Sequence, residues 1–351
     1  MSGPLQQMLM PLTAPASWIY GQAVAARNRG FDRGRRVGRV EPARPVISVG
    51  NITTGGVGKT PIVAWIAERL LAAGHQPVIA MRGYMARPGA LSDEQAEYHE
   101  RLPEVPVLAD PDRLAALNAF LPEHPETDCI LLDDGFQHRF VHRDLDLALI
   151  DATRGTMRDA LIPRGRLREP LESLRRADAV IITHASGADA IIEAQVEHHH
   201  GKPPIAWSNH TWSHLRFMAA EKGRCAEQRK ETSWLRGKRL VTMLGIGNPE
   251  PVLGQLNQAG ASVLATIPAG DHERYDRAKL MVAKGLCDGT DGLLMTAKDW
   301  VKARQVIDWT RWTVPVIVPH LVIDVYEGAA TLEELLLRVV RDFRGHEPTR
   351  T

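Results

Sequence analysis

The segment Pro45–Pro61, PVISVGNITTGGVGKTP, joins an apolar run to a glycine-rich turn that ends in Gly-Lys-Thr. Glycine adopts backbone dihedrals closed to other residues, so successive N–H groups of such a turn can point at phosphate oxygens. The helix expected to follow offers its positive N-terminal end to the same anion. The segment therefore predicts a nucleoside triphosphate site at the end of a buried strand.

The residues of this turn are expected to share the binding of the triphosphate. Lys59 neutralises the β- and γ-phosphates, and the hydroxyl of Thr60 can bind Mg²⁺. The full pattern G-x-x-x-x-G-K-[ST] would place glycine at position 53, where this chain has Thr53. The predicted nucleotide-binding set is Thr53, Thr54, Gly55, Gly56, Val57, Gly58, Lys59 and Thr60. This motif alone does not distinguish a kinase from a GTPase or an ATP-driven switch.

Composition limits the class of protein. With 351 residues, 44% hydrophobic and 24% charged, the chain is long enough for two soluble α/β domains. A net charge of +1 provides no field that would select nucleic acid. Cys129, Cys225 and Cys287 show no C-x-x-C spacing, which argues against disulfides and a structural zinc site and favours a reducing cytoplasm.

Strand-like runs alternate with helical patterns along most of the chain, which predicts a parallel sheet with helices on both faces. A second set of such units begins near Arg239, after a polar, tryptophan-bearing stretch. The expected strands are Val46–Val49, Val78–Met81, Val105–Leu108, Cys129–Leu132, Leu147–Ile150, Ala179–Thr183, Leu240–Leu244, Gly292–Thr296 and Val314–Val318. We expect an N-terminal segment at residues 1–40, a phosphate-loop domain at 41–203, a linker at 204–237 and a smaller α/β domain at 238–345.

The first 26 residues carry no charged side chain, and six arginines follow between positions 27 and 39. Three prolines, Pro4, Pro11 and Pro15, argue against a membrane-spanning helix, and no signal-peptide pattern is present. Beyond Pro15 a short helix is expected, with Trp18 and Tyr20 suited to a membrane interface and the arginines to anionic headgroups. A helix packed on the domain surface, with a solvated basic tail, is the other interpretation, and both remain open at this stage.

A second chemical motif is Cys129–His138, CILLDDGFQH, in which Asp133 and Asp134 follow an apolar run. Open α/β sheets bind ligands at the carboxyl ends of their strands. One of these carboxylates can bind Mg²⁺ directly or through water, as the acidic partner of a phosphate loop does. A strand end followed by an ordinary Asp-Gly turn is the alternative.

Taken together and in order, the motifs SVGNITTGGVGKTP, LLDDGFQHR, LIPRGRLREPL, GIGNPEPVLGQL and LLMTAKDWVK resemble the tetraacyldisaccharide 4′-kinase (lipid A 4′-kinase) family. The resemblance spans nearly the whole chain and includes Thr53. It implies ATP- and Mg²⁺-dependent phosphorylation of the 4′-hydroxyl of a tetraacyldisaccharide 1-phosphate. The implied place is the cytoplasmic face of the inner membrane, with peripheral or monotopic attachment and no obligate protein partner. It also implies two α/β domains joined by a short β-ribbon, with the site in the cleft between them.

The resemblance also assigns acceptor chemistry. The family uses the aspartate of a Gly-Asp-Glu motif as the base and a histidine of an Asp-His motif as its partner, which correspond here to Asp93 and His272. From the residues alone, each of these two positions looks structural. Catalytic roles therefore fall on Asp93, His272 and Lys59. Residues expected to line the substrate side are Arg82, Tyr84, His138, Arg168 and Glu169.

The chain departs from the family pattern at four positions, which are Met85, Ser92, Gln95 and Ala297. These departures lie on the acceptor side, so they bear on acyl-chain specificity more than on ATP binding. A protein of another class, a phosphate-loop ATPase or GTPase switch that acts on a protein partner, would share the phosphate loop. Such a switch would not require Asp93, His272 or the uncharged N-terminal segment.

Overall fold

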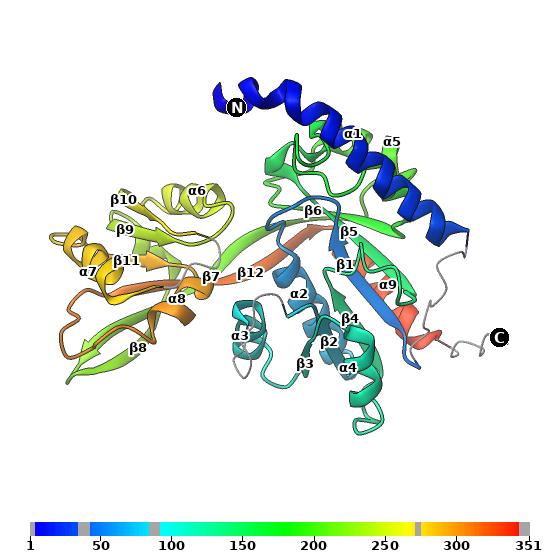
Figure 1. Cartoon of the computed structure of the whole chain (residues 1–351). Coiled ribbons are helices and arrows are strands. Elements are labelled where there is room, and N and C mark those ends of the chain that lie inside the picture. Colours follow the sequence, from blue (N-terminus) through cyan, green and yellow to red (C-terminus); the bar gives the residue numbers. More distant parts are fainter. Residues whose placement is uncertain (1–3, 34–42, 84–91, 271–274, 344–351) are drawn as a thin grey trace. The chain divides into compact units, whose positions relative to one another are not determined.

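The computed structural model describes residues 4–33, 43–83, 92–270 and 275–343. The chain divides into two compact units, each assembled from segments that are distant in sequence (Figure 1). Unit 1 comprises residues 1–85, 101–209 and 325–351, and unit 2 comprises residues 86–100 and 210–324. The domain boundaries expected from the sequence are contiguous, whereas the C-terminal helix belongs to unit 1 because it packs against the helix after the phosphate loop.

Unit 1 is built on a parallel sheet with the strand order β6-β5-β1-β4-β2-β3. Its elements are α1 (Pro4–Asp32), β1 (Val46–Asn51), α2 (Lys59–Ala72), β2 (Pro77–Met81), β3 (Val107–Ala109), α4 (Arg113–Phe120), β4 (Cys129–Asp133), β5 (Leu145–Asp151), the 3-10 turns η1 (Ala152–Arg154), η2 (Thr156–Arg158) and η3 (Leu171–Arg176), β6 (Ala179–Thr183), α5 (Ala190–His200) and α9 (Ala329–Arg341). The predicted parallel α/β sheet is thereby confirmed. Strand β1 lies at its centre, between β4 and β5.

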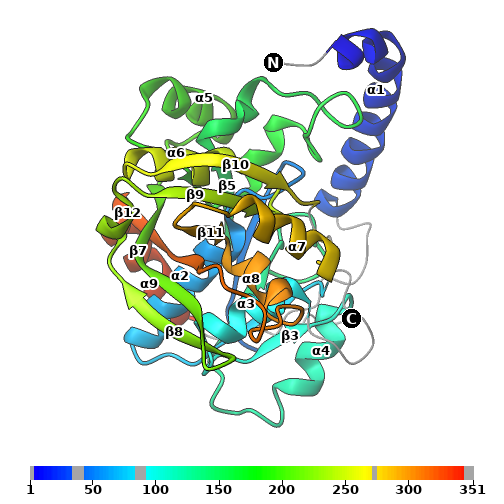
Figure 2. The same ribbon diagram turned by 90° about the vertical axis from the view of Figure 1, so that its left-hand side faces the viewer.

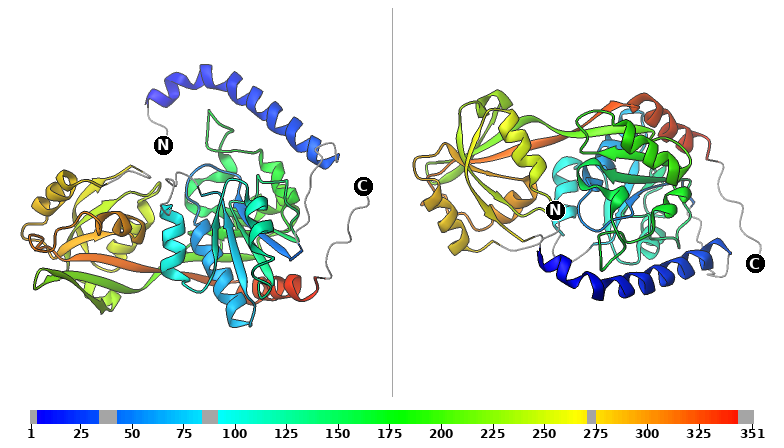
Figure 3. Two further views of the ribbon diagram at one scale, coloured as in Figure 1. Left: turned by 60° about the horizontal axis from the view of Figure 1, so that its bottom comes forward. Right: turned by 90° about the horizontal axis from the view of Figure 1, so that it is seen from above.

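Helices cover both faces of this sheet. On one face, alternate residues of β2 and β4 pack with Leu117 of α4, and alternate residues of β5 and β6 pack with Val196 of α5. Helix α2 packs against β1 and β4, with the buried residues Ile62, Ile66 and Leu70, and α9 lies beside α2 (Figure 3). Each buried strand is apolar on both sides because both of its faces are covered.

Helix α1 is longer than the sequence suggests. It runs from Pro4 to Asp32 and continues through Pro11 and Pro15, so the expectation of a short helix beginning after Pro15 is wrong (Figure 2). An internal proline removes one backbone hydrogen bond but need not end a helix that is held by tertiary contacts. Among the described residues, the structure contains no helix with the length and apolar character needed to span a membrane.

Unit 2 is built on the strands β10, β9, β11 and β12, which are neighbours in that order and parallel at each described pairing. Its elements are α3 (Asp93–Arg101), β8 (Arg224–Lys230), the 3-10 turn η4 (Thr232–Leu235), β9 (Arg239–Leu244), α6 (Glu250–Gln258), β10 (Ser262–Pro268), α7 (Arg277–Leu286), β11 (Gly292–Met295) and α8 (Ala297–Ala303). Two long strands, β7 (Ala206–Glu221) and β12 (Val316–Glu327), have residues in both units. Strand β8 pairs antiparallel with β7 inside the stretch expected to be a linker.

Candidate active site

The phosphate loop leaves the carboxyl end of β1 and enters α2 at Lys59. Gly55 and Gly58 have φ angles of 90° and 81°, which a side chain would make costly. Gly58 caps the helix without a side-chain acceptor, and the first turn of α2 contains no acidic residue. The N–H groups at this helix end, together with the helix dipole, therefore form a site for an anion.

Two neighbouring segments hold this loop in shape. The backbone N–H of Thr54 donates to the carbonyl of Arg166 at 2.7 Å, and that of Arg168 donates to the carbonyl of Ile52 at 2.7 Å. On the other side, the buried hydroxyl of Thr183, at the end of β6, donates to the carbonyl of Val57 at 2.9 Å. The loop is thus anchored to the arginine-rich segment and to a strand of the sheet before any ligand binds.

Thr53 and Asn51 explain the missing first glycine. The amide of Asn51 donates to the carbonyl and the hydroxyl of Thr53, at 2.9 and 2.8 Å. Its carbonyl oxygen accepts from Nζ of Lys59 at 3.4 Å. The Thr53 hydroxyl thereby helps to orient an amide that in turn contacts the ammonium of Lys59, and glycine would lack this hydroxyl.

Asp133 and Asp134 end β4 beside the phosphate loop, and Asp133 lies opposite Val49 of β1. Asp134 has a φ of 53°, a conformation in which Asp and Asn are tolerated better than most residues. One of its oxygens lies 3.4 Å from Nζ of Lys59, and the other lies 3.2 Å from Nη1 of Arg168. Burial opposes its charge, but Lys59 and Arg168 outweigh burial and hold the pKa of Asp134 below its ordinary value.

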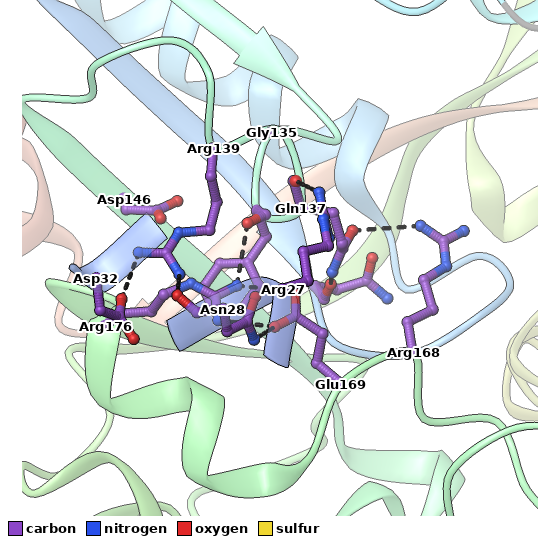
Figure 4. Close-up of polar contacts among 12 residues, drawn as sticks. Arg27, Asn28, Asp32, Gly135, Gln137, Arg139, Asp146, Arg168, Glu169 and Arg176 are labelled. Atoms are coloured by element: carbon purple, nitrogen blue, oxygen red, sulfur yellow. Dashed lines mark hydrogen bonds and ion pairs between the residues drawn. The ribbon is translucent and has the colours of Figure 1, made fainter. Parts of the chain in front are cut away.

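The side chain of Gln137 links two of these groups, Asn51 and Arg168 (Figure 4). Its Nε2 donates to the carbonyl of Asn51 at 2.7 Å, and its Oε1 lies 3.5 Å from Nη1 of Arg168. The loop that carries Gln137 packs tightly on β1, since a Cβ on Gly50 would lie 2.5 Å from the backbone nitrogen of Phe136. Position 137 is therefore fixed both by the backbone and by its side chain.

The remaining substrate-side candidates in unit 1 fall into different environments. His138 is half-buried, and burial together with Arg113 and Arg143 lowers its pKa to about 4, so its imidazole is neutral at pH 7. Arg82 is exposed just beyond β2. Glu169 is 1% exposed, and Arg176 donates to its two carboxylate oxygens at 2.7 and 2.9 Å. The structure therefore gives Glu169 a buried ion pair, and Arg168 a place beside Asp134.

The proposed acceptor machinery is only partly visible. Asp93 is the first residue of α3, in unit 2, and the structure describes its backbone but not its side chain. Tyr84 and His272 lie outside the described residues, as does Met85. Ala297 begins α8, where the retained Asp299 is fully buried and accepts from the N–H of Gly245 at 3.1 Å.

Sequence reasoning missed one cluster beside the loop. A Cβ on Gly55 would lie 2.7 Å from Nη1 of Arg154, so this guanidinium lies directly against the phosphate loop. Nε of Arg154 lies 3.1 Å from Asp151, which is fully buried and also lies 3.2 Å from Nδ1 of His184. The signal available in the sequence was that Asp151 ends a strand of the same sheet, as Asp133 does.

The donor set suits a magnesium ion held jointly with a nucleotide. Among the described residues no group of three or more His, Cys, Asp or Glu side chains is arranged to hold a metal by itself. Mg²⁺ usually binds through one or two carboxylates together with substrate phosphates. The hydroxyl of Thr60 and the carboxylates of Asp133 and Asp134 fit that pattern.

A phosphate loop on the central strand of a parallel sheet, with a lysine and two aspartates at the strand ends, defines a P-loop nucleotide-binding protein. The model of the family Tetraacyldisaccharide-1-P 4'-kinase matches residues 9–341. The chain belongs to this family.

Curated relatives match over most of their length. The tetraacyldisaccharide 4'-kinase of Azoarcus sp. is 37% identical over 332 residues, covering 90% of this chain and 88% of the relative. That of Geobacter metallireducens is 33% identical, covering 86% and 91%. The crystal structure of LpxK from Aquifex aeolicus in complex with ATP superimposes with a TM-score of 0.68 at 26% identity, covering 96% of this chain and 99% of that one.

Proposed function

We propose that this protein transfers the γ-phosphoryl group of ATP to the 4′-hydroxyl of a tetraacyldisaccharide 1-phosphate, producing lipid IVA for lipid A. The observation that carries the proposal is the setting of Lys59, which lies between Asn51 and Asp134 at an uncapped helix N-terminus, in a chain that matches the kinase family from residue 9 to residue 341. The relatives named above carry the same activity in their names.

The donor half of the reaction follows from the geometry. Phosphoryl transfer needs positioning and charge neutralisation more than covalent chemistry. Lys59 leaves a contact with Asp134 to meet phosphate oxygens, and the N–H groups of the loop and of α2 receive the remaining charge. Mg²⁺, bound by Thr60 with Asp133 or Asp134, would neutralise the β- and γ-phosphates. Arg168, already beside Asp134, supplies a further cation.

The acceptor half rests on the family resemblance. We assign removal of the 4′-hydroxyl proton to Asp93, with His272 as its partner. An aspartate can act as a general base if it reaches the hydroxyl within hydrogen-bond distance. Asp93→Ala should abolish turnover and leave ATP affinity intact. Near-normal turnover in this variant would remove Asp93 as the base.

The proposed activity is tested with labelled ATP, Mg²⁺ and a tetraacyldisaccharide 1-phosphate dispersed in detergent. Label recovered in the lipid supports the kinase. ATP hydrolysis that appears only on addition of a protein, without labelled lipid, supports the alternative of an ATPase switch. Equal activity on a deacylated, water-soluble disaccharide would instead identify a kinase that does not require a lipid.

We further propose that α1 attaches the protein to the cytoplasmic face of the inner membrane. On its outward side Trp18 and Ile19 are 67% and 62% exposed, and Arg29 and Arg33 are exposed beyond them. Large apolar side chains followed by arginines favour the interface of an anionic bilayer. The inward side of the same helix packs on the rest of unit 1, as the second interpretation expected, and membrane contact of the outward side is our proposal.

Flotation with anionic vesicles tests this attachment. The double variant Trp18→Ser/Ile19→Ser should float less than the intact protein. Ile191→Ser is a matched control, since Ile191 is 64% exposed and belongs to α5 rather than to α1. Equal flotation of the double variant and the intact protein would contradict the proposal.

A further inference from the structure

We propose that Arg27 and Asn28, on the inward side of α1, are positioning residues for the phosphate-transfer site, a proposal that rests on the kinase function given above. Helix α1 is then part of the catalytic scaffold as well as a membrane contact. Its bonds hold the segment 135–139 and Glu169, and these two elements hold the phosphate loop and Asp134. The contacts thus run in two steps, first from α1 to these two elements and then from the two elements to the phosphate-transfer site.

The inward side of α1 is continuous with the active-site loops. Ser17, Tyr20, Val24, Asn28 and Phe31 recur at intervals of three or four residues and so share one side of the helix. The Tyr20 hydroxyl donates to the carbonyl of Arg168 at 2.9 Å, and the Ser17 hydroxyl donates to the carbonyl of Leu161 at 2.9 Å. The helix also passes close to this segment at Gly21, where a Cβ would lie 2.9 Å from Cδ1 of Leu161.

Arg27 and Asn28 make the contacts nearest to the site (Figure 4). Nη2 of Arg27 donates to the carbonyl of Gln137 at 2.6 Å. Nδ2 of Asn28 donates to Oε2 of Glu169 at 2.8 Å, while Arg139 donates back to the Asn28 carbonyl at 3.2 Å. A cation donating to a carbonyl, and an amide donating to a buried carboxylate, are among the stronger hydrogen bonds in proteins.

The second step leads from the segment 135–139 and Glu169 to Lys59 and Asp134. Gln137, held at its carbonyl by Arg27, donates its side-chain amide to the carbonyl of Asn51, and Asn51 contacts Lys59. Glu169, held by Asn28, follows Arg168, which pairs with Asp134. Two hydrogen bonds therefore separate Arg27 from the backbone of Asn51, the last residue of β1 before the phosphate loop.

Arg176 contacts both Glu169 and the segment 135–139. Its guanidinium donates to Glu169 and to the carbonyl of Phe136 at 3.1 Å, and it lies 4.0 Å from the centre of the Phe136 ring. Of the side chains that hydrogen-bond to Glu169, Asn28 comes from α1, whereas Arg176 and Ser173 come from other segments of unit 1. Loss of Asn28 leaves the Glu169 charge paired with Arg176, so the carboxylate stays satisfied while its orientation is released.

Anchoring and positioning make different demands on α1. If α1 only attached the protein to a membrane, its inward polar contacts would affect stability and vesicle binding, but not nucleotide affinity in detergent-free buffer. If it positions the loops, loss of one contact displaces Gln137 or Arg168. A small displacement of a positioning group is enough to reduce a catalytic rate severalfold or more.

The test compares Arg27→Gln with Arg29→Gln. Both variants remove one positive charge from the same helix, two residues apart, but Arg29 is exposed on the outward side. We expect Arg29→Gln to lower binding to anionic vesicles at least as much as Arg27→Gln, because Arg29 is the one exposed on the membrane side. With saturating lipid dispersed in detergent, Arg27→Gln should nevertheless show about a tenfold lower kcat than Arg29→Gln. Equal kcat values in the two variants would overturn the role of Arg27.

Asn28→Ala provides the uncharged test, with Gln22→Ala, exposed on the outward side, as its control. Nucleotide affinity, measured with a fluorescent ATP analogue and no lipid, should fall about tenfold in Arg27→Gln and severalfold in Asn28→Ala, with Gln22→Ala unchanged. Thermal unfolding identifies a merely structural effect, in which stability falls while affinity and kcat stay at control values; that result overturns the proposal. Because this readout needs no lipid, it remains decisive even if lipid phosphorylation itself is not observed.

Discussion

Gly50→Ala is expected to damage both the stability and the nucleotide site of unit 1, because β1 and the loop after β4 touch at this glycine. The added Cβ would lie 2.5 Å from the backbone nitrogen and 2.6 Å from Cβ of Phe136. Ordinary contact begins near 3.4 Å, so β1 and the loop must separate by about 0.9 Å. Phe136 is fully buried and held by Arg176, which leaves no flexible side chain to absorb the change.

Overpacking of this kind costs about 1–3 kcal/mol, which corresponds to a fall in Tm of about 2–12 °C for a domain of this size. The separation also displaces Gln137 from Asn51, so ATP affinity should fall about tenfold. Urea unfolding at constant m and titration with a fluorescent ATP analogue measure the two effects. Circular dichroism confirms that the variant is folded before affinity is compared.

Gly187→Ala is the matched control, since a Cβ there would meet no atom within 4 Å and the backbone does not require glycine. Its free energy of unfolding should lie within about 0.5 kcal/mol of the unmodified protein, or slightly above it. If Gly50→Ala matches Gly187→Ala in stability and keeps its ATP affinity, the close approach of β1 and the Phe136 loop is not as described.

Three further outcomes are expected. Lys59→Ala should reduce phosphoryl transfer by at least about 100-fold with little change in Tm, and a variant retaining a tenth of the activity would contradict the role of Lys59. Burial raises the pKa of Asp146 to about 6. The folded state therefore binds a proton that the unfolded state releases near pH 4. The stability that this proton provides is present at low pH and is lost as the pH rises through 6. Between pH 4 and pH 7, the free energy of unfolding of Asp146→Asn in urea melts should therefore rise by up to about 3 kcal/mol relative to that of the unmodified protein. Parallel plots of this free energy against pH for the two proteins would refute the prediction. Because the pKa of His138 is about 4, His138→Gln should leave the shape of the pH dependence of kcat/KM between pH 5 and 8 unchanged, whereas loss of an inflection near neutrality would show that this histidine titrates there.

Local patterns were sufficient to predict the parallel sheet and the phosphate loop that follows its central strand. The phosphate loop, Lys59 and the paired carboxylates at the end of β4 follow from runs of apolar residues and their turn residues, because a buried parallel strand and the loop after it are adjacent in sequence. Arg168 was placed beside the site only by its match to the family motif, because local patterns did not single it out. The structure shows its contact with Asp134.

The missed features depend on contacts between distant segments. Nothing near Gln137 in sequence indicates that it bridges Asn51 and Arg168, and nothing near Asn28 indicates a bond to Glu169 across 141 residues. Helix α1 continues through two prolines because unit 1 supports its inward side, which proline propensity alone cannot reveal. Strands β7 and β8 carry too many polar residues to show an alternating strand pattern.

In the attachment proposed above, the thickness of α1 would set the distance between the phosphate-transfer site and the bilayer. With its side chains, an α-helix measures about 10–12 Å across. Trp18 and Ile19 occupy one side of it, and the residues that reach Gln137 and Glu169 occupy the other. Bound through α1, the enzyme would hold its loops about one helix diameter above the acyl region, at the height of a sugar headgroup. A disaccharide could then be phosphorylated while its acyl chains stay in the membrane, which avoids a cost of about 0.8 kcal/mol for each CH₂ drawn into water.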